Sequence, residues 1–285
     1  MGESVLSNDV IVIKSFNNNI VLVIDNGIEK VLFRKGIGFG KKAGEIIRRG
    51  TLLEKVFVIE NKDTQRNFNE LVDKVDGKLI ALVEEVLAEL SMELEEELNE
   101  NIHVALVDHL FYALKRLKDE EEIQNPFLVE TEILYSMEFS IACKLAKRIK
   151  DEMNLDIPDG EIGFIALHLH SARNNGRLSN TIKYSFLGST LIEHIEDRLE
   201  IEIDRMSLDY ARFLTHIRFT VERILGSILI KNDLKDIIRE KYNVSYKIAE
   251  ESKEIICKIL NIKDISEDEI AYLAMHIERF RVSIK

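Results

Sequence analysis

Two histidines stand close together in the run GEIGFIALHLHSAR, residues 160–173, at the end of an apolar segment. An imidazole there can be a buried structural group, a metal ligand, an acid or base, or an acceptor for a phosphoryl group. On a helix, His168 and His170 would point about 200° apart, so they cannot hold one ion together. The rest of the chain narrows these roles.

The histidines belong to an internal repeat. The run at 160–173 matches DEIAYLAMHIERFR at 268–281, and ALVDHLFYALKRL at 105–117 matches RFLTHIRFTVERI at 212–224, with offsets of 108 and 107 residues. Each early histidine is followed seven positions later by an arginine. Two patterns in the same order predict two copies of one helical domain. Together they select four histidines and two arginines: His109, His168, His216 and His276, with Arg116 and Arg223.

The remaining histidines and the missing motifs limit the chemistry. His170 aligns with Glu278, so the repeat does not require its imidazole. The chain has no HExxH, no Cys/His cluster at ligand spacing, no nucleophile elbow and no P-loop. We therefore expect no enzyme activity, no metal and no cofactor. Two roles stay open from the residues alone: structural histidines at a domain rim, or phosphoryl acceptors whose phosphate the arginines could pair.

Composition favours a protein of the reduced cytoplasm. No apolar run reaches the roughly 18–20 residues of a membrane helix, and the N-terminus does not read as a signal peptide. Cys143 and Cys257 are isolated and are interpreted as buried thiols. The net charge is −12, yet residues 1–56 hold nine Lys and Arg against six Asp and Glu. This asymmetry indicates a small basic module attached to an acidic body.

The basic module has the pattern of a small antiparallel sheet. Short runs rich in Val, Ile and Phe predict strands, and Asn26-Gly27 predicts a tight hairpin turn. The strands are expected at 10–15, 19–25, 29–35 and 55–60. Four strands give a thin core, so we expect a second copy to cover one face.

Polar residues of the basic module suit RNA, although a solvated sheet face fits them equally well. Cations can contact phosphates, amides can contact base edges and 2′-hydroxyls, and an aromatic ring can stack on a base. The candidates are Lys14, Asn17, Asn19, Arg34, Lys35, Phe39, Lys41 and Lys42.

From about residue 64 the apolar spacing becomes helical. The fold class is therefore mainly α: a small N-terminal β-sheet domain at 1–62, followed by two homologous all-α helical bundles at 63–177 and 178–285. Besides the helix that starts near 64, further helices are expected near 100–118, 131–153, 160–173, 187–198, 204–225, 233–240, 246–260 and 266–282.

These motifs together resemble the BglG/LicT/SacY transcriptional antiterminators of the bacterial phosphotransferase system, over nearly the whole length. VIKSFNNNIVLV and KGIGFGKK resemble the co-antiterminator RNA-binding domain, and LVDH, FIALHLHSA, THIRFTVERI and YLAMHIERF resemble the duplicated regulation domain. NPFLVETEILY and PDGEIGFIALHLHSA are similar to the glucose-type branch. The resemblance implies a homodimer that binds a hairpin in nascent mRNA and prevents termination of sugar-uptake genes, here glucose.

The resemblance also implies residue roles. RNA contacts come from positions matching Lys14, Asn17, Asn19, Lys35 and Phe39. In relatives, the EIIB domain of the sugar permease phosphorylates the first regulation domain, at positions matching His109 and His168, and inactivates the protein. The carrier HPr phosphorylates the second domain of relatives, at positions matching His216 and His276, which in many of them favours the active dimer and in the glucose branch has a weaker effect. Relatives have glycine where this chain has Arg34, which leaves the RNA contact at that position open.

Two other classes share the histidines. A phosphotransfer relay would hand the phosphoryl group onward, and a DNA-binding activator would carry the same regulation domains. A relay has no use for a sheet of amides and cations, and residues 1–60 show no helix-turn-helix pattern.

Overall fold

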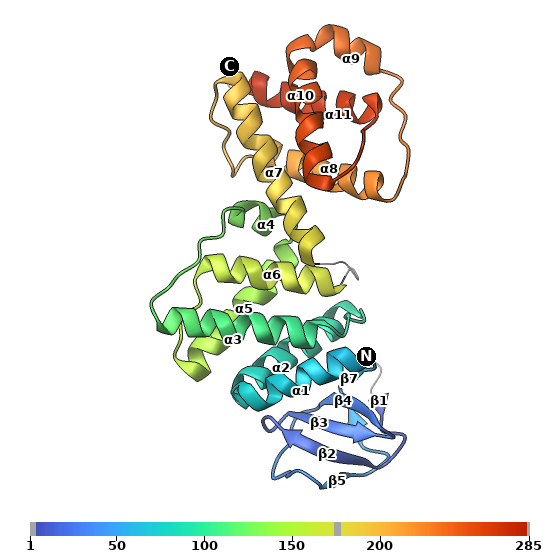
Figure 1. Cartoon of the computed structure of the whole chain (residues 1–285), viewed down its shortest axis with the longest axis vertical. Coiled ribbons are helices and arrows are strands. Elements are labelled where there is room, and N and C mark those ends of the chain that lie inside the picture. The colour runs from blue at the N-terminus through green and yellow to red at the C-terminus, as the bar shows by residue number, and fades with distance from the viewer. Residues whose placement is uncertain (1–3, 174–177, 284–285) are drawn as a thin grey trace. The chain divides into compact units, whose positions relative to one another are not determined.

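The structure, a computed structural model, describes residues 4–173 and 178–283 (Figure 1). It divides into two compact units, residues 1–125 with 137–176, and residues 126–136 with 177–285, called unit 1 and unit 2 below. In the described ranges, no helix has the length and apolar character needed to cross a membrane. The division into three domains, with boundaries at residues 62 and 177, stays a prediction. The two compact units do not test it, because unit 1 contains both the N-terminal sheet and the helices that follow it.

The N-terminal sheet has five antiparallel strands in the order β5-β2-β3-β4-β7. The four predicted strands are confirmed as β2 (Val10–Ser15), β3 (Ile20–Asp25), β4 (Ile28–Phe33) and β7 (Lys55–Ile59). Three two-residue strands were not predicted: β5 (Ile46–Ile47), and the separate pair β1 (Ser4–Val5) and β6 (Leu52–Leu53). The predicted turn is confirmed, since Asn26 and Gly27 both have positive φ, 51° and 85°.

Side chains of the same chain cover most of each face of the sheet, while Ile11, Ile46 and Val58 on its strands stay exposed. One face packs into the helical core of unit 1 through Phe16, Ile20, Leu22, Val31, Phe33, Phe57 and Ile59. The other face forms its own small core with side chains such as Val10, Val12 and Leu53. The expectation that a second copy must cover the sheet was therefore wrong, because helices of the same chain cover one face and the 37–53 segment contributes to the other. Dimerisation itself stays a prediction.

Unit 1 contains five helices among its described residues: α1 (Lys62–Lys74), α2 (Gly77–Leu94), α3 (Ile102–Lys118), α5 (Ser136–Met153) and α6 (Asp159–Arg173). The side chains of Asn61 and Asp76 accept hydrogen bonds from the first backbone N–H groups of α1 and α2, which fixes where these two helices begin.

Unit 2 contains α4 (Leu128–Leu134), α7 (Leu178–Leu199), α8 (Leu208–Leu225), α9 (Lys235–Lys241), α10 (Asn243–Leu260) and α11 (Glu267–Ser283). The predicted single helix over 131–153 was wrong, because the backbone of Tyr135 leaves the helical conformation between α4 and α5. In unit 2, α4 packs against α7 and α8, and the Tyr210 hydroxyl donates a hydrogen bond to Glu130.

The internal repeat is confirmed at the level of secondary structure. In both α2 to α6 and α7 to α11, two long helices are followed by one short helix and then by two more long helices. The short helices α4 and α9, and the long helices α5 and α10, begin 107 residues apart. The repeat therefore places both members of each histidine pair on equivalent helices: α3 and α6 in the first copy, α8 and α11 in the second.

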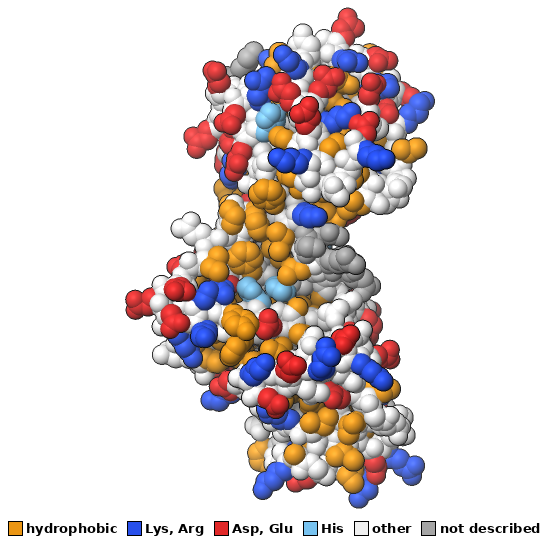
Figure 2. All heavy atoms as spheres, viewed as in Figure 1, with side chains coloured by type: hydrophobic (Ala, Val, Ile, Leu, Met, Phe, Trp, Pro, Cys, Tyr) orange, Lys and Arg blue, Asp and Glu red, His pale blue; other side chains and the backbone are white. Residues whose placement is uncertain are grey.

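The surface of unit 2 mixes acidic and basic side chains over the face drawn in Figure 2. Cys143 is exposed and Cys257 is half-buried. The interpretation of Cys143 as a buried thiol was wrong, because α5 turns this position away from the core that its neighbour Ala142 enters.

Candidate functional site

The two matched histidines of the first copy meet in unit 1. His109 on α3 and His168 on α6 have ring centroids 5.0 Å apart, with the rings inclined at 39°. Burial, and secondly the neighbouring His109, lower the pKa of His168 from 6.5 to about 3. His168 is therefore neutral near pH 7 and keeps an unprotonated ring nitrogen. Figure 2 shows histidine side chains at the surface of unit 1 among hydrophobic ones.

A buried carboxylate joins this pair to the predicted arginine. Glu161 on α6 accepts a hydrogen bond from Arg116 Nη2 at 2.8 Å, and its Oε2 lies 3.1 Å from His109 Nε2. The approach to His109 is close enough for an ion pair but does not have hydrogen-bond geometry. Burial raises the pKa of Glu161, but His109 and Arg116 outweigh it, so the carboxyl group titrates below its usual range.

The second copy repeats the arrangement in unit 2. His216 on α8 and His276 on α11 stack with centroids 4.5 Å apart and rings inclined at 30°. Burial and the neighbouring His276 lower the pKa of His216 to about 3, with a further contribution from Arg223. Burial and the guanidinium of Arg279 lower the pKa of His276 to about 4. Both imidazoles are therefore neutral near pH 7.

Hydrogen bonds around His216 define which nitrogen is basic. Glu269 accepts two bonds from Arg223, at 2.7 and 2.8 Å, and one from the Thr220 hydroxyl at 3.1 Å. Because that bond uses the hydroxyl hydrogen, His216 Nε2, 3.2 Å from Thr220 Oγ1, must be the donor in their contact. The Nδ1 nitrogen of His216 is then the nitrogen with a lone pair.

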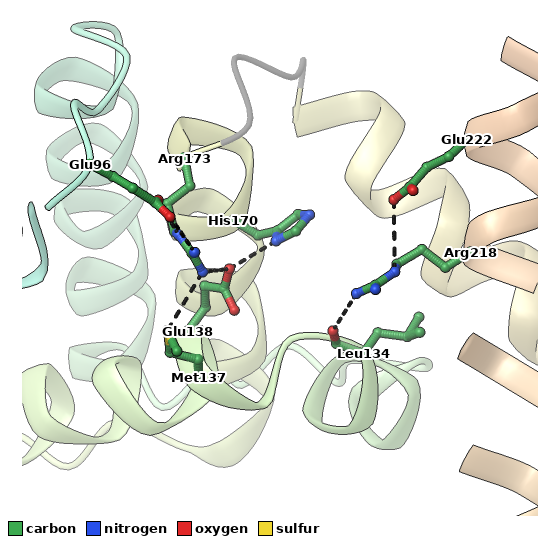
Figure 3. Close-up of polar contacts among 8 residues, drawn as sticks. All are labelled: Glu96, Leu134, Met137, Glu138, His170, Arg173, Arg218 and Glu222. Carbon is green, nitrogen blue, oxygen red and sulfur yellow. Dashed lines mark hydrogen bonds and ion pairs between the residues drawn. The ribbon is translucent and has the colours of Figure 1, made fainter. Parts of the chain in front are cut away.

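The histidines outside the repeat have carboxylate partners. His103 is buried and its Nδ1 lies 2.8 Å from Glu84. His170 points to Glu138, 2.9 Å away, which also accepts a hydrogen bond from Arg173 at 2.6 Å (Figure 3). The same view shows Arg218 of unit 2 beside the backbone carbonyl of Leu134.

His170 and Glu278, which align in the repeat, take part in equivalent hydrogen-bond networks. The two networks differ in which helix supplies the carboxylate. In the first copy, Glu138 on α5 binds His170 and Arg173. In the second copy the acid is Glu278 on α11, which accepts hydrogen bonds from Ser245 at 2.8 Å and from Arg281. Since Ser245 and Arg281 stand where the first copy has Glu138 and Arg173, His170 belongs to a local network that holds an arginine.

No group of three or more His, Cys, Asp or Glu side chains in the described ranges is arranged to hold a metal ion. The imidazoles instead meet in pairs, each beside one buried acid and one arginine.

Three RNA-binding candidates lie against the helices of unit 1. A break in strand register between Val12 and Lys14 moves the end of β2 to the helical face of the sheet. Lys14 Nζ donates to the backbone carbonyl of Val72, near the end of α1, at 2.6 Å. The side-chain amides of Asn17 and Asn19 both donate to Glu85 Oε1 of α2, each at 2.9 Å.

Three more candidates lie on the turn after β4, and the last two, Lys41 and Lys42, follow it, half-buried and exposed respectively. Phe39 is 76% exposed and Lys35 is exposed. Arg34 extends along the sheet and donates to the backbone carbonyl of Leu52 at 3.0 Å. Asn19 connects the two groups, because its Oδ1 accepts the Gly36 N–H at 3.1 Å. Lys35 and Phe39 are thus presented to solvent while the two asparagines are occupied.

The sequence patterns did not predict the carboxylates that contact the histidine pairs and the RNA-binding candidates. Glu161 and Glu269 carried a signal, since each stands seven residues before a matched histidine in the repeat. Glu85 carried none, because its asparagine partners are 68 and 66 positions away.

Two domain families and several known proteins match this chain. The PRD domain matches residues 84–172 and 189–280, and the CAT RNA binding domain matches residues 10–66. Protein GlcT of Staphylococcus haemolyticus is 34% identical over 100% of this chain and 98% of its own length. Transcription antiterminator LicT of Bacillus subtilis is 31% identical over 93% of this chain and 97% of its own length. The crystal structure of GlcT CAT-PRDI is 40% identical, covers 59% of this chain and 100% of its own, and has a TM-score of 0.49.

Proposed function

Because this chain belongs to the family of transcription antiterminators that join a CAT RNA-binding domain to two PRD domains, we propose that it binds an RNA hairpin in a nascent transcript and prevents termination there. The genes controlled are those of glucose uptake, as the names of the GlcT relatives suggest. The protein acts as a homodimer in the cytoplasm and has no catalytic role.

The observation that carries the regulatory half of this proposal is the duplicated histidine pair. In each copy two imidazoles lie in ring contact, 5.0 and 4.5 Å between centroids, beside a buried acid that binds an arginine. A neutral imidazole is a good nucleophile, and a phosphoryl group adds a charge of about −2. Such a charge next to Glu161 or Glu269 repels the acid and attracts its arginine, which would rearrange the helix pair.

The phosphoryl donors in this proposal are two proteins of the bacterial phosphotransferase system. The EIIB domain of a glucose permease modifies His109 and His168 when sugar is absent, and HPr modifies His216 and His276. The histidines support these roles because His109, His216 and His276 are partly exposed, while the more buried His168 contacts the ring of His109. Arg116 and Arg223 are candidates to pair the phosphate after it displaces their glutamates.

RNA binding is assigned to Lys14, Asn17, Asn19, Lys35 and Phe39, with Arg34 at the edge of the same turn. The exposed Phe39 ring offers a stacking surface, and Lys35 a cation for phosphate. The asparagine amides can read bases once they leave Glu85.

The proposal is tested with the full-length protein and a pool of RNA hairpins with randomised loops. Selection should enrich a discrete hairpin family, and phosphorylation by purified EIIB should release it from wild-type protein but not from the double variant His109→Ala, His168→Ala. Enrichment of no hairpin would refute RNA binding. Release from the double variant to the same extent would refute the assignment of these two histidines.

A further inference from the structure

A pocket of about 560 Å³ opens beside His276 in unit 2. Helices α8 and α11 supply its lining residues, among them His276. Two of its lining residues are arginines, Arg212 one turn before His216 on α8 and Arg279 one turn after His276 on α11. The lining residues are Leu208, Ala211, Arg212, Thr215, Met275, His276 and Arg279.

Within the described part of the chain, the two arginines of the pocket contact one shared carboxylate, and only loosely. Arg212 and Arg279 approach the same oxygen, Oδ1 of Asp209, at 3.5 and 3.6 Å. Charge-assisted hydrogen bonds are typically about 2.7–2.9 Å long, so neither contact is a close one. By contrast, Arg223 binds Glu269 at 2.7 and 2.8 Å. Two guanidinium groups against one carboxylate give the pocket a positive surplus next to a neutral imidazole.

The first copy has no such pair of arginines at equivalent positions. The residue four before the early histidine is Arg212 in the second copy and Ala105 in the first. The residue three after the late histidine is Arg279 in the second copy and the buried Ser171 in the first. The histidine pairs are built alike, but only the second copy adds these two cations.

We propose that Arg212 and Arg279 form an anion pocket that receives the phosphoryl group of phosphorylated His276, so that the second helical domain retains phosphate on its late histidine better than the first. The inference rests on the proposed function, which supplies phosphorylation of His276. A ring nitrogen of His276 forms the new N–P bond while the bond from phosphorus to the donor nitrogen breaks and its electron pair stays with the donor. The planar guanidinium groups then bind the phosphoryl oxygens in pairs, as arginine does with phosphate.

The test uses the full-length protein and phosphoramidate, a small phosphoryl donor whose protonated nitrogen leaves as ammonia. Mass spectrometry follows phosphate on His276 and, as an internal reference, on His168 in the same molecules. In the variant Arg212→Gln, Arg279→Gln we expect His276 to be phosphorylated about tenfold more slowly and to lose its phosphate sooner after the donor is removed. His168 should keep its wild-type rate and lifetime.

Two further variants sharpen the result. Arg218→Gln removes another partly exposed arginine of α8 that does not line the pocket, and it should leave His276 unchanged. Arg212→Lys with Arg279→Lys keeps the charges but not the paired bonds, and it should give intermediate lifetimes. Both arginines of the pocket are 51% exposed, so the variants should melt at the wild-type temperature.

Equal rates and lifetimes at His276 in wild-type and Gln-variant protein would overturn the proposal, as would wild-type protein that takes no phosphate at His276. Failure of the proposed function looks different, because no hairpin would then be retained by the unphosphorylated wild-type protein.

Discussion

Replacing Glu85 with alanine should increase the affinity of the full chain for its RNA hairpin. Glu85 Oε1 holds the side-chain amides of Asn17 and Asn19, each at 2.9 Å, and these are the amides assigned to base recognition. Under the proposed function, RNA and Glu85 therefore compete for the same donors. Removing the carboxylate removes the competitor while leaving both asparagines in place.

The size of the effect follows from the two bonds. A hydrogen bond to a charged group contributes about 1.5–3 kcal/mol where it is shielded from water. Because the Glu85 side chain is 14% exposed, water competes for both bonds, so each contributes about 1 kcal/mol, below that range, and the pair contributes about 2 kcal/mol. We expect the dissociation constant for the selected hairpin to fall by about tenfold to thirtyfold, since 1.4 kcal/mol corresponds to a factor of ten.

The assay is fluorescence anisotropy with a labelled hairpin at fixed ionic strength. Glu89→Ala is the matched control, because Glu89 lies one turn further on α2 and binds Arg148 at 2.7 Å instead of the asparagines. Unchanged affinity in Glu85→Ala, or an equal gain in Glu89→Ala, would show that the contact to the asparagines does not compete with RNA. Melting curves of both variants verify that they fold.

Four further outcomes are expected. Lowering the pH from 7 to 5 should destabilise the protein by about 2 kcal/mol through His168 alone. At pH 5 the unfolded chain binds a proton at this histidine, whose unfolded-state pKa is near 6.5, whereas the folded state, with a pKa of about 3, does not. Denaturation of wild-type and His168→Gln protein at both pH values measures the loss of stability, and equal losses in the two proteins would contradict this reasoning. Phe39→Ala should weaken RNA binding about tenfold without lowering the melting temperature, since the ring is 76% exposed; an unchanged dissociation constant would exclude stacking on this ring. Gly38→Ala should both destabilise the protein and weaken RNA binding, because a Cβ at this position would lie 2.1 Å from the Asn17 carbonyl oxygen. Thermal unfolding measures the stability and fluorescence anisotropy measures the RNA affinity. A variant as stable as the wild type would show that the loop relaxes freely. Raising the salt concentration should lower RNA affinity, with a flat response counting against Lys35 as a phosphate contact.

The sheet illustrates where sequence patterns suffice. Alternating Val and Ile and the Asn26-Gly27 turn predicted four strands that the structure contains, because strand alternation and positive-φ turns depend on neighbouring residues. What covers the sheet was predicted wrongly. A second copy was expected, but the face that includes Phe16 packs on helices of the same chain, and only the assembled core reveals that.

The boundaries and packing partners of the helices also could not be read from the sequence. Spacing could not place the break at Tyr135 between α4 and α5, since both sides have helical periodicity. Nor could it show that α4 packs with α7 and α8, because packing partners are chosen by surfaces that form only after the helices exist.

By itself, the sequence determined that the chain has a small basic sheet and two copies of a helical domain, and it singled out four histidines. It could do so because a duplication leaves the same residue types at the same spacing, which is visible along the chain. Only the tertiary structure decided what surrounds those residues. It brought each histidine pair into ring contact, placed Asp209 between two arginines, and brought Glu85 to asparagines 68 and 66 positions away. Such contacts depend on how separate helices and strands dock, and no local pattern of residues records that geometry.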